Sequence, residues 1–152
     1  MEKKSILIVD DDRTILRSLR EILESEGYSV ETVETGKEAI EKTKTQFYNL
    51  ALLDIKLPDI EGTKLLKAMC ETSPKMVKIM VTGYPALENA VEALNMGADA
   101  YLMKPVTPEK MLKVVEKKLK EQEEAKSMTE EKVAQWIETR VKKLESEHCK
   151  KD

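Results

Sequence analysis

Five short apolar runs, separated by segments with helical spacing, limit the folds open to this chain more than any other feature of its sequence. The runs are Ile6–Val9, Ser29–Val33, Leu50–Leu53, Val77–Val81 and Ala100–Met103. Between them, apolar residues recur at intervals of three and four, as they do in amphipathic helices. Because strands alternate with helices and the runs are almost continuously apolar, the pattern predicts an α/β fold with a parallel sheet covered on both faces.

The order of the five predicted strands follows from the way parallel strands are connected. Right-handed crossovers favour the order 2-1-3-4-5, which makes this a doubly wound sheet of the flavodoxin-like kind. In that order the chain leaves the first strand in one direction and returns to the third strand on its other side. Ligands of such sheets bind beyond the carboxyl ends of the strands at this switch point, so we expect the functional site there.

Helix boundaries are marked by residues that favour helix ends. Thr35 and Glu38 have the spacing of a capping box, and Thr107 followed by Pro108 is typical of a helix N-terminus. A fourth helix is predicted by the apolar spacing within residues 87–94. These signals agree with helices between the predicted strands.

Polar side chains follow four of the five predicted strands. They are Asp10, Asp11 and Asp12 after the first strand, Asp54 after the third, Thr82 after the fourth and Lys104 after the fifth. Carboxylates from neighbouring strands repel one another, so either one of them is protonated or a cation lies between them. A hard divalent ion such as Mg²⁺ suits such a site, and a lysine and a threonine suit a phosphoryl group beside it. For Asp12, capping the following helix is an equal alternative.

These residues lie in motifs that resemble the receiver domain of two-component response regulators. The motifs are Ile6–Asp12, Leu50–Gly62, Val81–Gly83 and Lys104-Pro105, and the resemblance covers about residues 4–121. It implies that Asp54 accepts a phosphoryl group from a sensor histidine kinase or a phosphotransfer protein. It also implies that the domain assists its own phosphorylation and dephosphorylation and is a signalling domain rather than an enzyme.

The same resemblance assigns roles to the other residues of the motifs. Mg²⁺, or Mn²⁺ in its place, would be held by Asp10, Asp11, Asp54 and the backbone carbonyl of Lys56. The phosphoryl group on Asp54 would be contacted by Thr82 and Lys104, and the peptide bond before Pro105 would be cis.

The resemblance also implies that phosphorylation changes the conformation of one surface of the domain. Thr82 and Tyr101 would respond to phosphorylation and alter the surface made by the fourth helix, the fifth strand and the fifth helix. That surface would then signal to a downstream protein target.

Two alternative functions are left open by the sequence. The pattern Asp10-x-Asp12-x-Thr14 resembles the first motif of haloacid-dehalogenase-type phosphatases, in which Asp10 would be the nucleophile. That alternative leaves Asp54 and the loop that follows it unexplained. A receiver fold that acts only as a scaffold, without phosphorylation, is the other alternative, although such variants lose an aspartate or the lysine.

The chain is expected to divide into a receiver domain at residues 1–121 and a charged amphipathic helical extension at residues 122–152. Ser127 and Glu130 match a capping box, which predicts a new helix after the polar stretch Lys120–Lys126. An apolar stripe would follow at Val133, Trp136, Ile137, Val141 and Leu144. We expect Trp136 to be sheltered by one of three arrangements: folding back on the receiver, pairing with a second copy as a homodimer, or docking on another protein.

The composition of the chain argues against a nucleic-acid-binding protein and against a membrane protein. The chain has 26 basic and 29 acidic residues, and residues 107–152 have no evident basic face, so we do not expect direct nucleic-acid binding within this chain. No apolar run exceeds four residues, far below the ~20 of a membrane span. Cys70 and Cys149 lack metal-ligand spacing and fit free thiols in a cytoplasmic protein.

Overall fold

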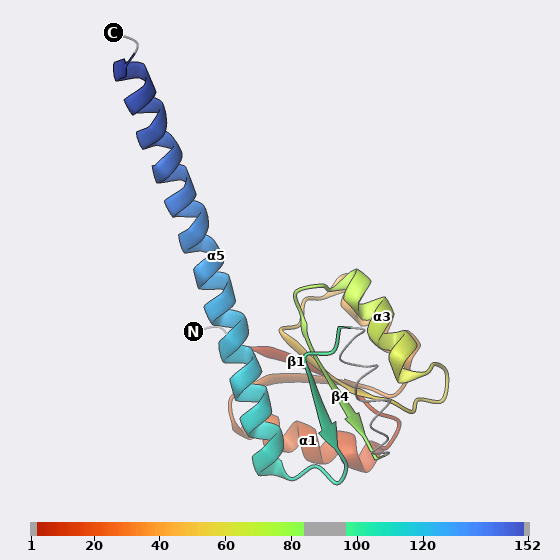
Figure 1. Ribbon diagram of the computed structural model, residues 1–152. Helices are drawn as coiled ribbons and strands as arrows, with labels where there is room; N and C mark the ends of the chain where they lie inside the picture. The colour runs from red at the N-terminus through yellow and green to blue at the C-terminus, as the bar shows by residue number, and fades with distance from the viewer. Residues whose placement is uncertain (1–2, 84–96, 151–152) are drawn as a thin grey trace. The chain divides into compact units, whose positions relative to one another are not determined.

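A computed structural model describes residues 3–83 and 97–150 of the chain (Figure 1). Its elements are β1 (Ser5–Val9), α1 (Arg13–Ser25), β2 (Ser29–Val33), α2 (Gly36–Thr45), β3 (Leu50–Asp54), α3 (Gly62–Thr72), β4 (Val77–Thr82), β5 (Ala100–Met103) and α5 (Pro108–Lys150). The strands agree with the five predicted runs to within one residue at each end. The helix predicted within residues 87–94 lies outside the described residues.

The strands form one parallel sheet in the order β2-β1-β3-β4-β5. The predicted fold class and strand order are therefore confirmed. β1 lies between β2 and β3, with Ile6 beside both Val30 and Leu50. The switch point consequently lies where β1 and β3 end, next to each other, at Val9 and Asp54.

Helices cover both faces of the sheet because successive strand residues point to opposite sides. Ile6 and Ile8 of β1 pack in one buried cluster with residues of α1 and of the first turns of α5. Leu7 and Val9 pack in a second cluster with residues of α2 and α3. Figure 1 shows α1 and α3 on opposite sides of the strands. The continuous apolar runs of the sequence thus form the middle layer of a three-layer unit.

Two predicted helix starts have the hydrogen bonds of side-chain caps. The hydroxyl of Thr35 accepts a bond from the backbone N–H of Glu38 at 3.2 Å at the start of α2. The hydroxyl of Thr107 accepts one from the backbone N–H of Lys110 at 3.3 Å, and Pro108 is the first residue of α5. Both caps are confirmed, and each places its helix directly after a strand of the sheet.

The predicted break in the C-terminal region is wrong, because α5 is one helix from Pro108 to Lys150. The stretch Lys120–Lys126 contains neither glycine nor proline and consists of Glu, Lys, Gln and Ala, which are good helix formers. A capping box stabilises a helix start only where the preceding chain is not already helical, so Ser127 does not begin a new helix. Within the described residues, no helix combines the length and the apolar character needed to cross a membrane.

The chain comprises two compact units, Met1–Leu119 and Lys120–Asp152. The first unit contains the sheet and the part of α5 whose side chains Met111, Val115 and Leu119 are buried. In the second unit, Trp136 is 62% exposed. Shelter of Trp136 by folding back, by a second copy or by another protein stays a prediction.

Candidate functional site

Three aspartates meet at the carboxyl edge of the sheet. Asp10 directly follows β1, Asp11 comes next, and Asp54 is the last residue of the neighbouring strand β3. One carboxylate oxygen from each lies within 4.8 Å of the others. Asp10 and Asp54 are buried, at 3% and 6% exposure, whereas Asp11 is exposed. The sheet topology thus brings together the carboxylates that the sequence placed after separate strands.

Lys104 joins two of these carboxylates from the other side of the site. Its ammonium donates to Oδ2 of Asp10 at 3.0 Å and to Oδ2 of Asp54 at 3.3 Å. The backbone N–H of Lys104 donates to the carbonyl of Thr82 at 2.6 Å, which continues the pairing of β4 and β5 beyond the strands. The peptide bond between Lys104 and Pro105 is cis, as the resemblance implied.

The pKa values of Asp54 and Lys104 are shifted by burial and by the charges beside them. Burial raises the pKa of Asp54, and the negative charge of Asp10 raises it further. The N–H of Lys56 and the ammonium of Lys104 lower that pKa in part. Burial lowers the pKa of Lys104, but the hydrogen bond and charge of Asp10, followed by those of Asp54, outweigh it and leave the pKa raised. The ammonium therefore stays charged and offsets one of two adjacent negative charges.

Asp12 is separate from this cluster. Its carboxylate accepts hydrogen bonds from the backbone N–H groups of Thr14 at 2.9 Å and Ile15 at 3.4 Å, so it caps the start of α1. Its own backbone N–H donates to Oδ1 of Asp10 at 2.9 Å. Of the two alternatives for Asp12, the structure therefore shows the cap, and Asp12 helps the site through its backbone.

The remaining predicted site residues lie around this cluster. Thr82 is the last residue of β4 and is 1% exposed. The backbone N–H of Lys56 donates to Oδ1 of Asp54 at 3.2 Å. Tyr101 is half-buried on β5, beside Met80 of β4, where it packs against the core of the α2–α3 face. Lys56 and Thr82 thus belong to the same sheet edge as Asp54, whereas Tyr101 lies within β5.

The loop after β3 is held by contacts that the sequence patterns do not predict. The backbone N–H of Gly62 donates to the carbonyl of Ile55 at 2.7 Å, and a Cβ on Gly62 would lie 2.4 Å from Ile55 Cα. Asp59 accepts hydrogen bonds from the backbone N–H groups of Gly36 and Lys37, each at 2.9 Å. The loop therefore also caps α2, and the sequence carries no signal for a partner so far along the chain.

Lys78 is a buried cation that the sequence analysis leaves without a role. It lies near the start of β4, at the opposite edge from Asp54, and it is 2% exposed. Its ammonium donates to the backbone carbonyls of Ser73 at 2.6 Å and Met76 at 2.7 Å. Burial lowers its pKa. The single charge inside an apolar run is the only sequence signal, and the contacts show that it satisfies carbonyls of the segment between α3 and β4.

The donor set at the sheet edge fits a hard divalent cation. Three carboxylates face one another with a single ammonium between two of them, which leaves a net negative charge. Carboxylate and backbone carbonyl oxygens are the ligands that Mg²⁺ and related ions prefer, and such ions retain several waters. The exposure of Asp11 leaves one side of the cluster accessible to those waters and to a further ligand.

Comparison with known proteins identifies the family. The family described as the response regulator receiver domain matches residues 6–116. The alginate biosynthesis transcriptional regulatory protein AlgB of Pseudomonas putida is 38% identical over 114 residues, which are 75% of this chain and 25% of that protein. The chain therefore spans about a quarter of the length of that curated relative.

Solved structures show the same relationship. A response regulator receiver domain protein (CheY-like) from Methanospirillum hungatei JF-1 is 56% identical, with a TM-score of 0.80, over 82% of this chain and 99% of that one. A response regulator from Burkholderia pseudomallei, with a phosphorylated aspartic acid, a calcium ion and citrate, is 27% identical, with a TM-score of 0.72, over 83% of this chain and 74% of that one. This chain belongs to the response regulator receiver domain family, a family of signalling domains of two-component systems.

Proposed function

We propose that this receiver domain accepts a phosphoryl group on Asp54 from the phosphohistidine of a sensor histidine kinase or a phosphotransfer protein. The observation that carries the proposal is the position of Asp54: a buried carboxylate at the end of β3, 3.3 Å from the Lys104 ammonium and clustered with Asp10 and Asp11. The related Burkholderia response regulator, whose structure contains a phosphorylated aspartic acid and a calcium ion, supports it.

The hydrogen bonds of the two buried carboxylates favour Asp54 over Asp10 as the nucleophile. Asp10 accepts from the N–H of Asp12 at 2.9 Å on one oxygen and from Lys104 at 3.0 Å on the other. Asp54 accepts from the N–H of Lys56 at 3.2 Å and from Lys104 at 3.3 Å. The longer bonds hold the lone pairs of Asp54 less tightly, and burial together with the charge of Asp10 raises the pKa of Asp54, which favours its carboxylate as a nucleophile.

The residues that would hold the cation are Asp10, Asp11, Asp54 and the backbone carbonyl of Lys56, with Mg²⁺ as the expected ion and Mn²⁺ as its substitute. When bound, the ion supplies positive charge that offsets the charge of the phosphoryl oxygens. Asp10 is positioned for this role by its own hydrogen bonds, and Asp11 is exposed to solvent at the edge of the cluster.

The chemical step is a displacement at phosphorus. A carboxylate oxygen of Asp54 forms a bond to phosphorus, the phosphorus–nitrogen bond of the phosphohistidine breaks, and the imidazole retains the bonding electron pair. Ionised Asp54 has no proton to lose in this step. The ammonium of Lys104, which already lies against Oδ2 of Asp54, pairs with the transferred phosphoryl oxygens. Attack of water on the same phosphorus reverses the modification.

The phosphoryl group would change the surface through Thr82 and Tyr101. Thr82 is buried at the end of β4, and the adjacent strand β5 carries Tyr101 beside Met80. New acceptor oxygens on Asp54 would attract the Thr82 hydroxyl, and Tyr101 would turn into the space that the threonine leaves. Such a local change biases a two-state surface that includes β5 and α5 and signals to a downstream protein.

Acetyl phosphate, a small phosphoryl donor, tests the proposal without the kinase. Intact-mass spectrometry should show one phosphoryl group on the wild-type chain in Mg²⁺, and none after chelation or in Asp54→Asn. Asp11→Ala should lose labelling together with its Mg²⁺ dependence. Asp12→Asn, which retains a capping side chain outside the metal cluster, is the matched control and should label like wild type. An unlabelled wild-type chain would contradict the proposal.

A further inference from the structure

The loop between β3 and α3 is a short hairpin that is closed at its base. The backbone N–H of Gly62 donates to the carbonyl of Ile55 at 2.7 Å, and this bond joins the two ends of the loop. Lys56 pairs with Glu61 in an isolated antiparallel bridge, and residues 57–60 form the turn beyond it. The base fixes the ends of the loop, so the orientation of the turn depends on its contacts with the rest of the domain.

The carbonyl of Lys56 opens on the side of the aspartate cluster. Because the hydrogen bond at the base flanks the bridge, the N–H and the carbonyl of Lys56 both point away from Glu61. The N–H donates to Oδ1 of Asp54 at 3.2 Å, so the carbonyl lies on the same side of the hairpin as Asp54. A carbonyl of a loop can serve a cation only while the loop keeps this orientation, and groups that orient a metal ligand therefore contribute to metal affinity.

Asp59 attaches the turn of this hairpin to the start of α2. Its Oδ1 accepts a hydrogen bond from the backbone N–H of Gly36, and its Oδ2 accepts one from the backbone N–H of Lys37, each at 2.9 Å. The side chain of Ile60 packs directly on Gly36, where a Cβ would overlap its Cγ2 methyl group. Because both carboxylate oxygens are bound and hydrogen bonds to an ionised group are strong, Asp59 fixes the angle of the turn as well as its position.

We propose that Asp59 is a positioning residue for the metal site, which it affects by holding the hairpin in the orientation that directs the Lys56 carbonyl toward the cation. The inference rests on the proposed function, because it takes that carbonyl as a ligand. Asp59 lies three residues after Lys56, and Pro58 between them has a fixed backbone φ. A displacement of the turn is therefore transmitted to the carbonyl instead of being absorbed by free rotation of the backbone.

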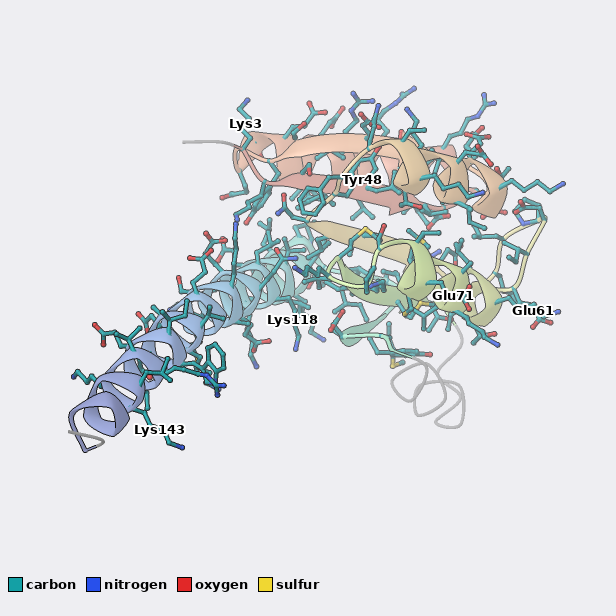
Figure 2. The ribbon with its side chains drawn as sticks, turned by 90° about the horizontal axis from the view of Figure 1, so that it is seen from above. Lys3, Tyr48, Glu61, Glu71, Lys118 and Lys143 are labelled. Carbon is teal, nitrogen blue, oxygen red and sulfur yellow. The ribbon has the colours of Figure 1, made fainter. Side chains whose placement is uncertain are left out.

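Mg²⁺ titration calorimetry of the full-length chain tests this role with two matched controls. Asp59→Ala should weaken Mg²⁺ binding by about tenfold, the lower end of what groups that orient metal ligands contribute. Thr35→Ala removes another cap from the start of α2 but leaves the loop attached. Glu61→Gln removes a charge from the same loop, and Figure 2 shows its exposed side chain pointing outward at the start of α3, where it makes no capping bond. Both controls should bind Mg²⁺ like wild type.

The outcomes of this titration separate the positioning role from the proposed function. Unchanged Mg²⁺ affinity in Asp59→Ala would refute the positioning role alone. An equal loss in Thr35→Ala or in Glu61→Gln would also overturn it, because the loss of a cap or of a charge would then explain the effect. A wild-type chain that does not bind Mg²⁺ would refute the metal site of the proposed function and the positioning role with it. Phosphoryl transfer is not involved in any of these measurements.

Hydrogen exchange of the wild-type chain gives a reciprocal test that needs no substitution. If the attachment of Asp59 favours Mg²⁺ binding, Mg²⁺ must favour that attachment by the same factor. The amides of Gly36 and Lys37 should therefore exchange more slowly in Mg²⁺ than after chelation. The amide of Lys110, which Thr107 caps at the start of α5, is the matched control and should change less. Equal slowing of all three amides, or no slowing at Gly36 and Lys37, would overturn the proposal.

Discussion

Lys104 and Asp54 form an ion pair of 3.3 Å in which the ammonium contacts the same carboxylate whose phosphorylation we propose. The same ammonium lies 3.0 Å from Asp10, so one cation contacts two buried carboxylates and offsets only one of their charges. A divalent ion and the Lys104 ammonium are therefore competitors for the same negative charge, whereas a phosphoryl group on Asp54 would offer oxygens to both.

Lys104→Met should consequently change metal binding and phosphorylation in opposite directions. Loss of the nearby positive charge should tighten Mg²⁺ binding by about tenfold, or ~1.4 kcal/mol. Loss of the phosphoryl-contacting donor should slow labelling by acetyl phosphate by roughly a hundredfold. Titration calorimetry and labelling kinetics measure the two effects, and Lys104→Arg, which retains the charge, should show near-normal metal affinity. Weaker Mg²⁺ binding in Lys104→Met would refute this competition.

Asp12→Ala should destabilise the fold without affecting the metal site. The substitution removes the carboxylate that accepts bonds from Thr14 and Ile15, and losing such a cap costs about 1 kcal/mol. The backbone N–H that donates to Asp10 is retained. Urea unfolding should therefore show the loss, while Mg²⁺ titration and labelling stay unchanged. A large drop in Mg²⁺ affinity would place Asp12 among the ligands instead.

Asp59 should make the stability of the fold sensitive to acid. Hydrogen bonds from the backbone N–H groups of Gly36 and Lys37 lower the pKa of Asp59. A carboxyl group whose pKa is lowered on folding contributes stability above its unfolded pKa, and that stability is lost as the pH falls through the folded pKa. Unfolding free energies measured from neutral pH downward should therefore fall more steeply in wild type than in Asp59→Asn. Parallel pH curves for the two chains would contradict this assignment.

Gly62→Ala should be more destabilising than Gly36→Ala, although both glycines begin helices. A Cβ at Gly62 would lie 2.4 Å from the backbone Cα of Ile55, next to Asp54, whereas a Cβ at Gly36 would meet the methyl Cγ2 of the Ile60 side chain. A side chain can rotate away and a backbone cannot, so we expect a cost of about 2–3 kcal/mol for Gly62→Ala and a smaller one for Gly36→Ala. Thermal unfolding of the two variants measures the order, and its reversal would contradict the close approach.

Much of the fold and of the site geometry could be predicted because both depend on local patterns and on sheet topology. Apolar runs such as Leu50–Leu53 are buried on both faces of the sheet. A short, continuously apolar run is typical of a parallel strand that is covered on both sides. Once the strands are parallel and in the order observed, their carboxyl ends share one edge. Asp10, Asp54 and Lys104 must then approach one another, whatever their separation in sequence.

The features that could not be predicted depend on tertiary contacts or on competition between local signals. The hydrogen bonds that Asp59 accepts connect the loop after β3 to the first turn of α2, and no pattern in either segment encodes the other. The capping box at Ser127 is a valid local signal, but the helix-forming residues before it extend α5 through that position. Lys78 resembles an exposed lysine until its carbonyl partners are known.

The most direct test of the account is the identity of the phosphorylated carboxylate. After incubation with acetyl phosphate and Mg²⁺, borohydride reduction converts an aspartyl phosphate into homoserine, which peptide mass spectrometry locates. We predict homoserine at position 54 alone, and none in chain treated without Mg²⁺. Homoserine at position 10 would contradict the receiver mechanism and favour a phosphatase with Asp10 as nucleophile, and no homoserine at any position would favour a receiver fold that serves only as a scaffold.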